Sequence, residues 1–186
     1  MTTLLKRYRF DTEQYAALAR QGILGPDARV ELLDGEIVEM SPISPKHLWT
    51  VNNLNRLLQA SLGTDAELSI QNPVHLSAHN EPEPDVAVLR LSPGLHRRLP
   101  SAQDILFLIE ASDSSLLKDL HVKLPLYAAA SIPEVWIVDL ERDVVTQHCL
   151  PVAGTYTVSA EFARGDVMES RTCPGCRIAV DDIIPD

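Results

Sequence analysis

The chain has 186 residues, of which 45 % are hydrophobic and 23 % charged, a balance typical of globular proteins and unlike that of disordered or fibrous chains. We therefore expect a single domain over residues 1–186, which can bury a core without a disulfide or a metal. The net charge of −10 argues against nucleic-acid binding that ignores sequence, because phosphates would be repelled on average. Basic groups at Lys6–Arg9 and His96–Arg98 still allow a polyanion on one face.

No apolar run approaches the ~20 residues of a membrane helix, and the start of the chain lacks the apolar stretch of a secretion signal. The three cysteines are few and odd in number, which fits a reducing compartment. We expect a cytoplasmic protein without a membrane partner.

The first predicted elements are a short helix and a β-hairpin. Asp11 or Thr12 is suited to cap a helix that runs to about Gln21. Residues 29–40 then predict a hairpin, because Asp34-Gly35 between two β-rich runs is a strong turn signal.

A longer helix follows the hairpin. Ser44 is expected to cap it, and Pro45 is tolerated in its first turn. Apolar residues recur at helical spacing as far as Leu62, and Gly63 is expected to end the helix.

The rest of the chain predicts a sheet and a further helix. The helix is expected over 119–130, with 113–121 partly irregular and Pro125 near its first turn. The segment 105–110 is almost wholly apolar, as in a strand covered on both faces. This order predicts an α/β domain with a mixed sheet flanked by helices. The expected extended segments are 66–76, 86–91, 105–110, 135–139, 144–150 and 155–162.

Two carboxylates are expected to meet at one edge of this sheet. Asp85 stands at the entry of strand 86–91, and Glu110 is expected to end strand 105–110. If these strands pair antiparallel, the start of one lies beside the end of the other. Converging carboxylates raise each other's cost of ionisation, and a divalent cation relieves it. Oxygen ligands favour Mg²⁺ (or Mn²⁺), which readily takes phosphate oxygens.

The helix after these strands carries a candidate catalytic lysine. Asp119 and Lys123 are four residues apart, as are Lys123 and Tyr127, so the three can share a helical face. A lysine beside such a metal site can orient or deprotonate a water and stabilise charge on a phosphorane.

Glu31 and His47 are further candidates. Glu31 is expected to pair with Val38 across the hairpin, which places a carboxylate among apolar neighbours or at a solvated rim. His47 is expected in the first turn of the second helix, where the helix dipole disfavours its protonation. It would bind phosphate, contact metal-bound water, or simply cap the helix.

Several motifs occur in order over about residues 8–184. They are Glu31–Pro42, His47, Gln71–Val74, Glu83–Val88, Ile109–Ser115, Asp119, Lys123–Ala128 and Ile132–Asp139. Together they resemble the Uma family (Uma-two) of small bacterial restriction-endonuclease-like proteins. Pro84-Asp85 followed by Glu110 is also similar to the PD-(D/E)XK nuclease pattern.

The resemblance implies a restriction-endonuclease-like core and metal-dependent hydrolysis of phosphodiester bonds. Asp85 and Glu110 would be the metal ligands. Ser112 stands where the broader nuclease pattern has a strand lysine, and Lys123 on the helix would take that place. A homodimer is expected, since enzymes of this fold often cut two strands with two subunits.

Three functions remain open. The first is a Mg²⁺-dependent DNA endonuclease that uses Asp85, Glu110 and Lys123, supported by Glu31 and His47. The second is a non-catalytic nuclease-fold module for protein or nucleic-acid contact, favoured by the acidic net charge and by the missing strand lysine. The third is a hydrolase of small phosphoesters.

Two other features have competing interpretations. Arg97 and Arg98 lie on the loop 92–104, which is expected beside the proposed site, and they would either contact phosphates there or lie in solvent. Cys173 and Cys176 form a lone CxxC without a second zinc pair, so a Pro-Gly turn is favoured over a zinc site.

Overall fold

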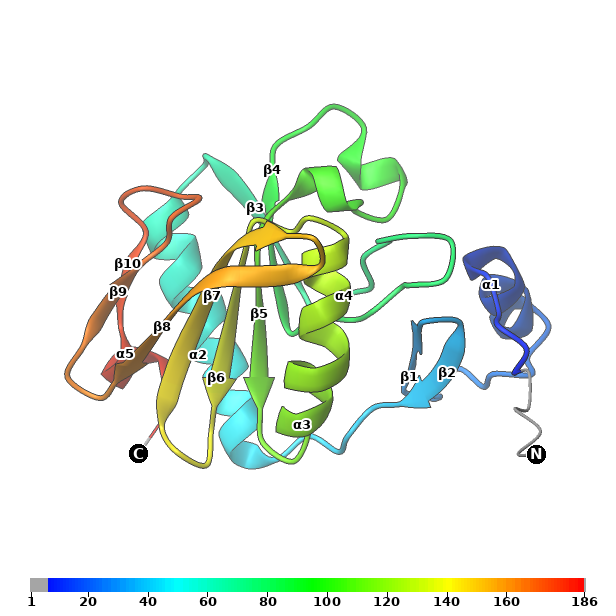
Figure 1. Cartoon of the computed structure of the whole chain (residues 1–186), viewed down its shortest axis with the longest axis horizontal. Helices are drawn as coiled ribbons and strands as arrows, with labels where there is room; N and C mark the ends of the chain where they lie inside the picture. Colours follow the sequence, from blue (N-terminus) through cyan, green and yellow to red (C-terminus); the bar gives the residue numbers. More distant parts are fainter. Residues whose placement is uncertain (1–6, 186) are drawn as a thin grey trace.

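A six-stranded mixed sheet forms the centre of the protein (Figure 1). The computed structural model describes residues 7–185, so Lys6 of the N-terminal basic group lies outside the described residues. Neighbouring strands are antiparallel except β5 and β6, which are parallel. In spatial order the strands are β3 (Ala66–Ile70), β4 (Val86–Arg90), β5 (Ile105–Ser112), β6 (Glu134–Asp139), β7 (Val144–Val152) and β8 (Thr155–Ala163).

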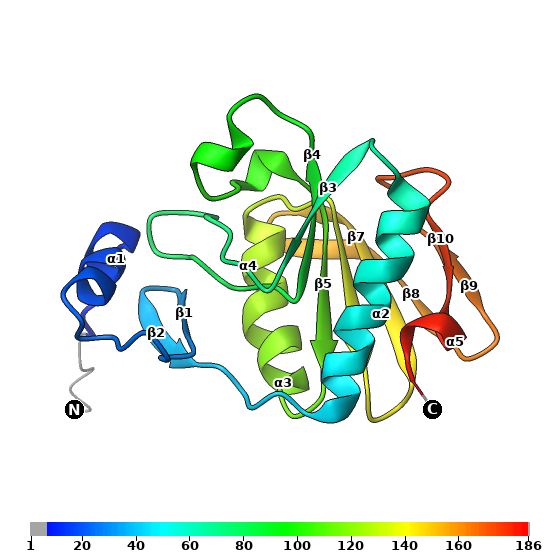
Figure 2. The same ribbon diagram turned by 180° about the vertical axis from the view of Figure 1, so that it is seen from behind.

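Helices cover both faces of this sheet (Figures 1 and 2). Helix α2 (Pro45–Leu62) packs on one face. A continuous helical segment packs on the other, made of α3 (Leu116–Lys118), a π-helix (Asp119–Lys123) and α4 (Leu124–Ala129). Successive strand residues point to opposite faces, so alternate residues of the apolar strands enter the two cores. The expected α/β fold with a mixed sheet between helices is confirmed.

The N-terminal segment also follows its local signals. Asp11 accepts a hydrogen bond from the Gln14 N–H and caps α1 (Thr12–Arg20). Strands β1 (Val30–Leu33) and β2 (Glu36–Glu39) form the predicted hairpin. Gly35 has a φ of 75° at its turn, and a Cβ there would lie 2.6 Å from the Cβ of Arg9. The glycine therefore allows the chain before α1 to cross the turn.

The chain ends in a small hairpin of β9 (Val167–Glu169) and β10 (Arg177–Ala179), followed by the short helix α5 (Val180–Ile183). Between the strands, Cys176 N–H donates to Cys173 O at 3.0 Å. The CxxC thus forms the expected Pro-Gly turn. Within residues 7–185, no helix has the length and apolar character needed to cross a membrane.

Several predicted boundaries are wrong, and three of them bear on the proposed site. Strand β5 does not end at Glu110 but continues to Ser112, because its last residues pair with β6. Strand β3 ends at Ile70, and Gln71 leaves the extended region with a φ of 50°. The third helix begins at Leu116 rather than 119. Much of the stretch 113–121, which was expected to be irregular, is helical and includes the start of the π-helix.

The loop 92–104 does not lie beside the proposed site. It follows the end of β4, whereas Asp85 precedes its start, so the strand's length of roughly 17 Å separates them. Two short 3₁₀ turns, Leu95–Arg97 and Ala102–Asp104, shape this loop. Arg98 donates to both carboxylate oxygens of Asp104, at 2.6 and 2.8 Å. This arginine therefore serves the loop rather than the site.

Candidate active site

A narrow cavity lies where β4 begins, between the hairpin, the start of α2 and the helical segment of α3. Its free volume is about 40 Å³, enough for a few water molecules. All five residues that the sequence predicts for the site line it: Glu31, His47, Asp85, Glu110 and Lys123. The structure thus brings together side chains from five separate segments of the chain.

Asp85 is fixed by hydrogen bonds to both of its oxygens. Its Oδ2 accepts from the Ala111 N–H at 2.8 Å. Its Oδ1 accepts from Gln71 Nε2 at 3.2 Å and lies 3.0 Å from His47 Nε2. The antiparallel pairing of β4 with β5 places Val86 opposite Ile109, which explains why Asp85 reaches the backbone just after Glu110.

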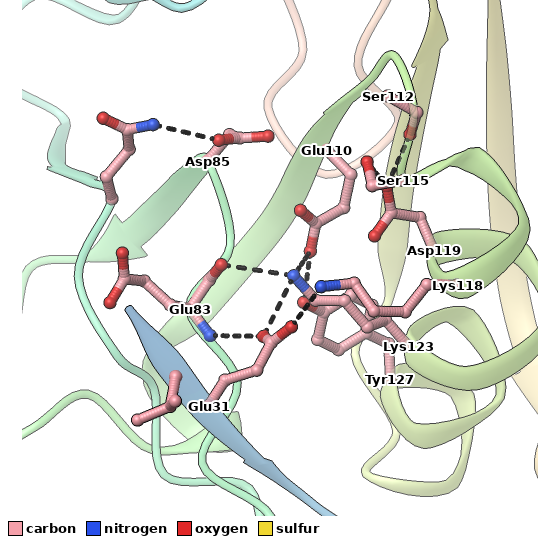
Figure 3. A network of polar contacts seen from close by, with 12 residues as sticks. Glu31, Glu83, Asp85, Glu110, Ser112, Ser115, Lys118, Asp119, Lys123 and Tyr127 are labelled. Carbon is pink, nitrogen blue, oxygen red and sulfur yellow. Dashed lines mark hydrogen bonds and ion pairs between the residues drawn. The ribbon is translucent and has the colours of Figure 1, made fainter. Parts of the chain in front are cut away.

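Glu110 and Lys123 form an ion pair at the bottom of the cavity (Figure 3). The Lys123 Nζ lies 2.7 Å from Glu110 Oε1, and both side chains are 3 % exposed. Tyr127 also donates its hydroxyl proton to Glu110 Oε1. Glu110 was the lone charge of an apolar strand, and its partners come from the next helix.

Glu31 joins the same cluster from the hairpin. It pairs with Val38, as the two-residue turn predicts, and its side chain is fully buried rather than at a solvated rim. Lys118 Nζ lies 2.7 Å from Glu31 Oε1, and Lys123 Nζ lies 3.4 Å from Glu31 Oε2. The Glu83 N–H donates to Glu31, and Lys123 donates to the Glu83 carbonyl. Figure 3 shows both lysines approaching Glu31 from the helical segment.

The buried charges shift one another's pKa. Burial raises the pKa of Glu110 to about 8, although Lys123 opposes the rise. Burial acts to raise the pKa of Glu31, but Lys123 and Lys118 outweigh it and hold that pKa below its usual value. Burial acts to lower the pKa of Lys123, but Glu110 and Glu31 outweigh it and raise that pKa. Lys123 is therefore a charged ammonium that contacts both Glu31 and Glu110.

The expected effect of the helix dipole on His47 is wrong. The hydrogen bond to Asp85 raises the pKa of His47, and burial opposes this only in part. Burial acts to raise the pKa of Asp85. The contact with His47, the charge of Lys123 and the hydrogen bond from the Ala111 N–H together outweigh burial and lower that pKa. The contact with Asp85 thus favours protonation of His47, the opposite of what was expected from its place in the helix.

The π-helix explains how the lysine reaches the sheet. Pro125 has no N–H and clashes with the carbonyl four residues before it, which disfavours a regular α-helix there. The Leu124 N–H instead donates to the Asp119 carbonyl five residues back. This wider turn buries both Asp119 and Lys123. Asp119 is fixed separately, since Ser112 and Ser115 donate to it at 2.8 and 2.6 Å.

Carboxylate oxygens are the ligands that a hard divalent cation prefers, but the site offers few of them. Asp85 and Glu110 present carboxylates to the same cavity. Within residues 7–185, no three His, Cys, Asp or Glu side chains are arranged so that they could hold a metal ion. Two carboxylates with water and phosphate oxygens are a normal set for Mg²⁺. A cation would share Glu110 with Lys123.

Sequence reasoning missed Lys118, which binds Glu31 across 87 positions of the chain. The only local signal is its place one residue before Asp119, in the segment that was expected to be irregular. The contacts of the Glu83 N–H and carbonyl were missed as well, because a pattern of side chains does not predict hydrogen bonds of the backbone.

Two comparisons with known proteins found matches. The model of a family named Uma2, described as "Putative restriction endonuclease", matches residues 12–181. No curated protein matches the sequence. A solved structure from Anabaena variabilis, described as a putative nuclease belonging to DUF820, superposes with a TM-score of 0.72 at 11 % identity, over 94 % of this chain and 97 % of the other. At this identity the superposition shows the fold alone.

Proposed function

The chain belongs to the Uma2 family, described as putative restriction endonucleases, and from this premise we propose that it is a divalent-cation-dependent endonuclease acting on DNA. One observation carries the proposal. Glu31, Asp85 and Glu110 enter one cavity together with the buried ammonium of Lys123. Structural ion pairs do not need such a cavity, whereas hydrolysis of a phosphodiester needs carboxylates, a cation and a water in one place.

Asp85 and Glu110 would hold Mg²⁺ or Mn²⁺. Bound there, the cation would supply Lewis-acid polarisation of the phosphodiester and would favour ionisation of a water. His47, Gln71 and the Ala111 N–H fix the orientation of Asp85, and Tyr127 does the same for Glu110.

Lys123 is the proposed catalytic cation. Contacts with Glu110, Glu31 and the Glu83 carbonyl hold its ammonium at the bottom of the cavity. From there it can orient the attacking water and stabilise negative charge that develops on the phosphorane. Glu31 supports the site by keeping Lys123 and Lys118 in place. His47, whose Nδ1 is buried without a hydrogen bond, supports it beside Asp85.

We also propose a homodimer, because two copies of such a site can cut the two strands of a duplex. Light scattering during size-exclusion chromatography measures the mass, and a monomer that still cleaves both strands would overturn this part of the proposal.

The direct test incubates the purified protein with labelled single-stranded, duplex and branched DNA in Mg²⁺, Mn²⁺ or EDTA. We expect cleavage in the cations only, and a fall of about a hundredfold or more in Asp85→Asn. Asp182→Asn, an exposed carboxylate on α5, is the matched control and should cleave as the wild type does. Failure of the wild-type protein on every substrate, or full activity of Asp85→Asn, would overturn the proposal.

A second candidate is the non-catalytic module. The contact between Lys123 and Glu110 favours it, because this ion pair occupies a carboxylate that a metal needs. Calorimetric titration of Mn²⁺ into the wild type and Asp85→Ala separates the two. Binding that is lost with Asp85 supports the enzyme, and absence of binding in both proteins supports the module.

A further inference from the structure

The rim of the cavity carries an arginine that the buried cluster does not use. Arg29 lines the cavity and is exposed, just before β1. Inside, the carboxylates already have cationic neighbours: Lys118 and Lys123 contact Glu31, and His47 contacts Asp85. Among the described residues, Arg29 has no carboxylate within ion-pair distance, so its charge is available at the entrance.

Backbone and side-chain contacts hold Arg29 in this place. Its carbonyl accepts from the Met40 N–H at 2.9 Å, which closes the open end of the hairpin. Its Nη1 donates to the Ser41 carbonyl at 3.0 Å. The guanidinium therefore lies along the segment 40–43, which forms one wall of the cavity. Its charge acts to lower the pKa of both His47 and Glu83, as expected of a cation near the two.

A polyanionic substrate needs such a group. The cavity is lined by six carboxylates, because Glu83, Asp113 and Asp119 join Glu31, Asp85 and Glu110, and the whole chain carries a net charge of −10. A phosphodiester approaching the entrance is repelled unless a cation faces it. A guanidinium with N–H groups left over after one carbonyl contact can bind a phosphate through two parallel hydrogen bonds.

We propose that Arg29 binds a backbone phosphate of the nucleic acid next to the phosphodiester that enters the cavity. This inference rests on the proposed nuclease function and assigns it a substrate-binding residue. Arg29 holds the strand at the entrance, and the side chains inside carry out the chemistry. Loss of Arg29 therefore affects binding more than the chemical step.

The test compares Arg29→Gln, Arg29→Lys and Arg56→Gln. Arg56 is an exposed arginine on α2 that does not line the cavity. Arg56→Gln is therefore the control that loses the same single charge as Arg29→Gln. Fluorescence anisotropy measures binding of labelled DNA, of the form that the wild type cleaves, in Ca²⁺ over a range of salt. Cleavage in Mn²⁺ gives KM and kcat.

We expect Arg29→Gln to weaken binding about tenfold at low salt and to reduce the slope of log affinity against log salt by about one. KM should rise with little change in kcat. The affinity of Arg29→Lys should lie between those of the wild type and Arg29→Gln, because a lysine keeps the charge but not the paired hydrogen bonds. Arg56→Gln should bind with the wild-type affinity and slope.

If the wild type cleaves DNA and Arg29→Gln binds it with unchanged affinity and slope, the role of Arg29 is refuted while the nuclease function stands. An equal loss in Arg56→Gln refutes it as well, because the effect is then one of overall charge. If the wild type neither binds nor cleaves, the nuclease function fails and the inference fails with it.

Discussion

Lys123 stabilises the fold as well as serving the proposed chemistry. Its ammonium is buried between Glu110 and Glu31, and removal of one partner from a buried ion pair typically costs about 3–5 kcal/mol. A loss of activity in Lys123 variants would therefore combine lost catalysis with lost stability. Glu110→Gln can be followed through stability alone, because glutamine has nearly the same shape and still accepts hydrogen bonds.

Glu110→Gln should reveal the buried proton through its pH dependence. The pKa of Glu110 rises from its ordinary value of 4.5 to about 8 on folding. Within this window the folded protein binds a proton that the unfolded chain has lost, so this group makes the protein less stable as pH rises. We expect the free energy of unfolding of Glu110→Gln, relative to the wild type, to increase between about pH 5 and about pH 8.

Urea denaturation at several pH values measures this difference, and Glu67→Gln, exposed on β3, serves as the control. A difference that stays constant, or that changes in favour of the wild type, would contradict a raised pKa at Glu110.

At the residue scale, the sequence predicted the acidic side chains better than their cations. The turn at Asp34-Gly35 sets the position of Glu31, and antiparallel pairing sets those of Asp85 and Glu110. Lys118 could not be predicted in the same way. Its contact with Glu31 depends on how the hairpin lies against the helical segment, and neither local spacing nor charge pattern determines that packing.

At the scale of elements, ends that are marked by capping residues could be predicted from the sequence. Ends that depend on pairing with a distant strand could not. Ser44 accepts a hydrogen bond from the His47 N–H and Gly63 ends α2, as expected. The end of β5 depends instead on β6, since Ala111 pairs with Val138 and Ser112 with Asp139. The residues of β5 alone do not indicate where pairing with a parallel strand much later in the chain will end.

Pro125→Ala tests whether the π-helix positions the lysine. Alanine restores an N–H and removes the clash of the proline ring, so the segment can become a regular α-helix. This change would rotate Lys123 away from Glu110 and Glu31. We expect lower stability in urea, because the buried Lys123 loses its carboxyl partners, and cleavage slower by up to about a hundredfold, the effect of a misplacement of about 1 Å.

Pro151→Ala, in β7 and outside the cavity, is the control and should cleave at the wild-type rate. A Pro125→Ala variant that is also fully active would mean that the wider turn is dispensable for the site.

The whole molecule carries its own counter-charges for the acidic cluster. Lys118, Lys123 and His47 contact the carboxylates, so we expect folding to be independent of a metal ion. EDTA should abolish cleavage and leave the thermal midpoint of the metal-depleted protein unchanged, whereas added Mg²⁺ should raise the midpoint slightly by binding the folded state. Scanning fluorimetry measures this, and a marked fall in EDTA would indicate a structural metal.

At this scale, the order of predicted elements was sufficient for the α/β class and the flanking helices. The position of the loop 92–104 was not predicted correctly, although the antiparallel pairing of β4 and β5 already places it far from Asp85. The arrangement of strands across the sheet needed the three-dimensional structure, since β5 is parallel to one neighbour and antiparallel to the other.

The single parallel pair has a consequence for synthesis of the protein. Parallel strands need a long crossover between them, and here the crossover from β5 to β6 carries both lysines of the cluster. During translation Glu31, Asp85 and Glu110 leave the ribosome first. Lys118 and Lys123 follow, but their helical segment packs against β6 as well as β4 and β5. A nascent chain therefore completes the proposed site only after residue 139 has emerged.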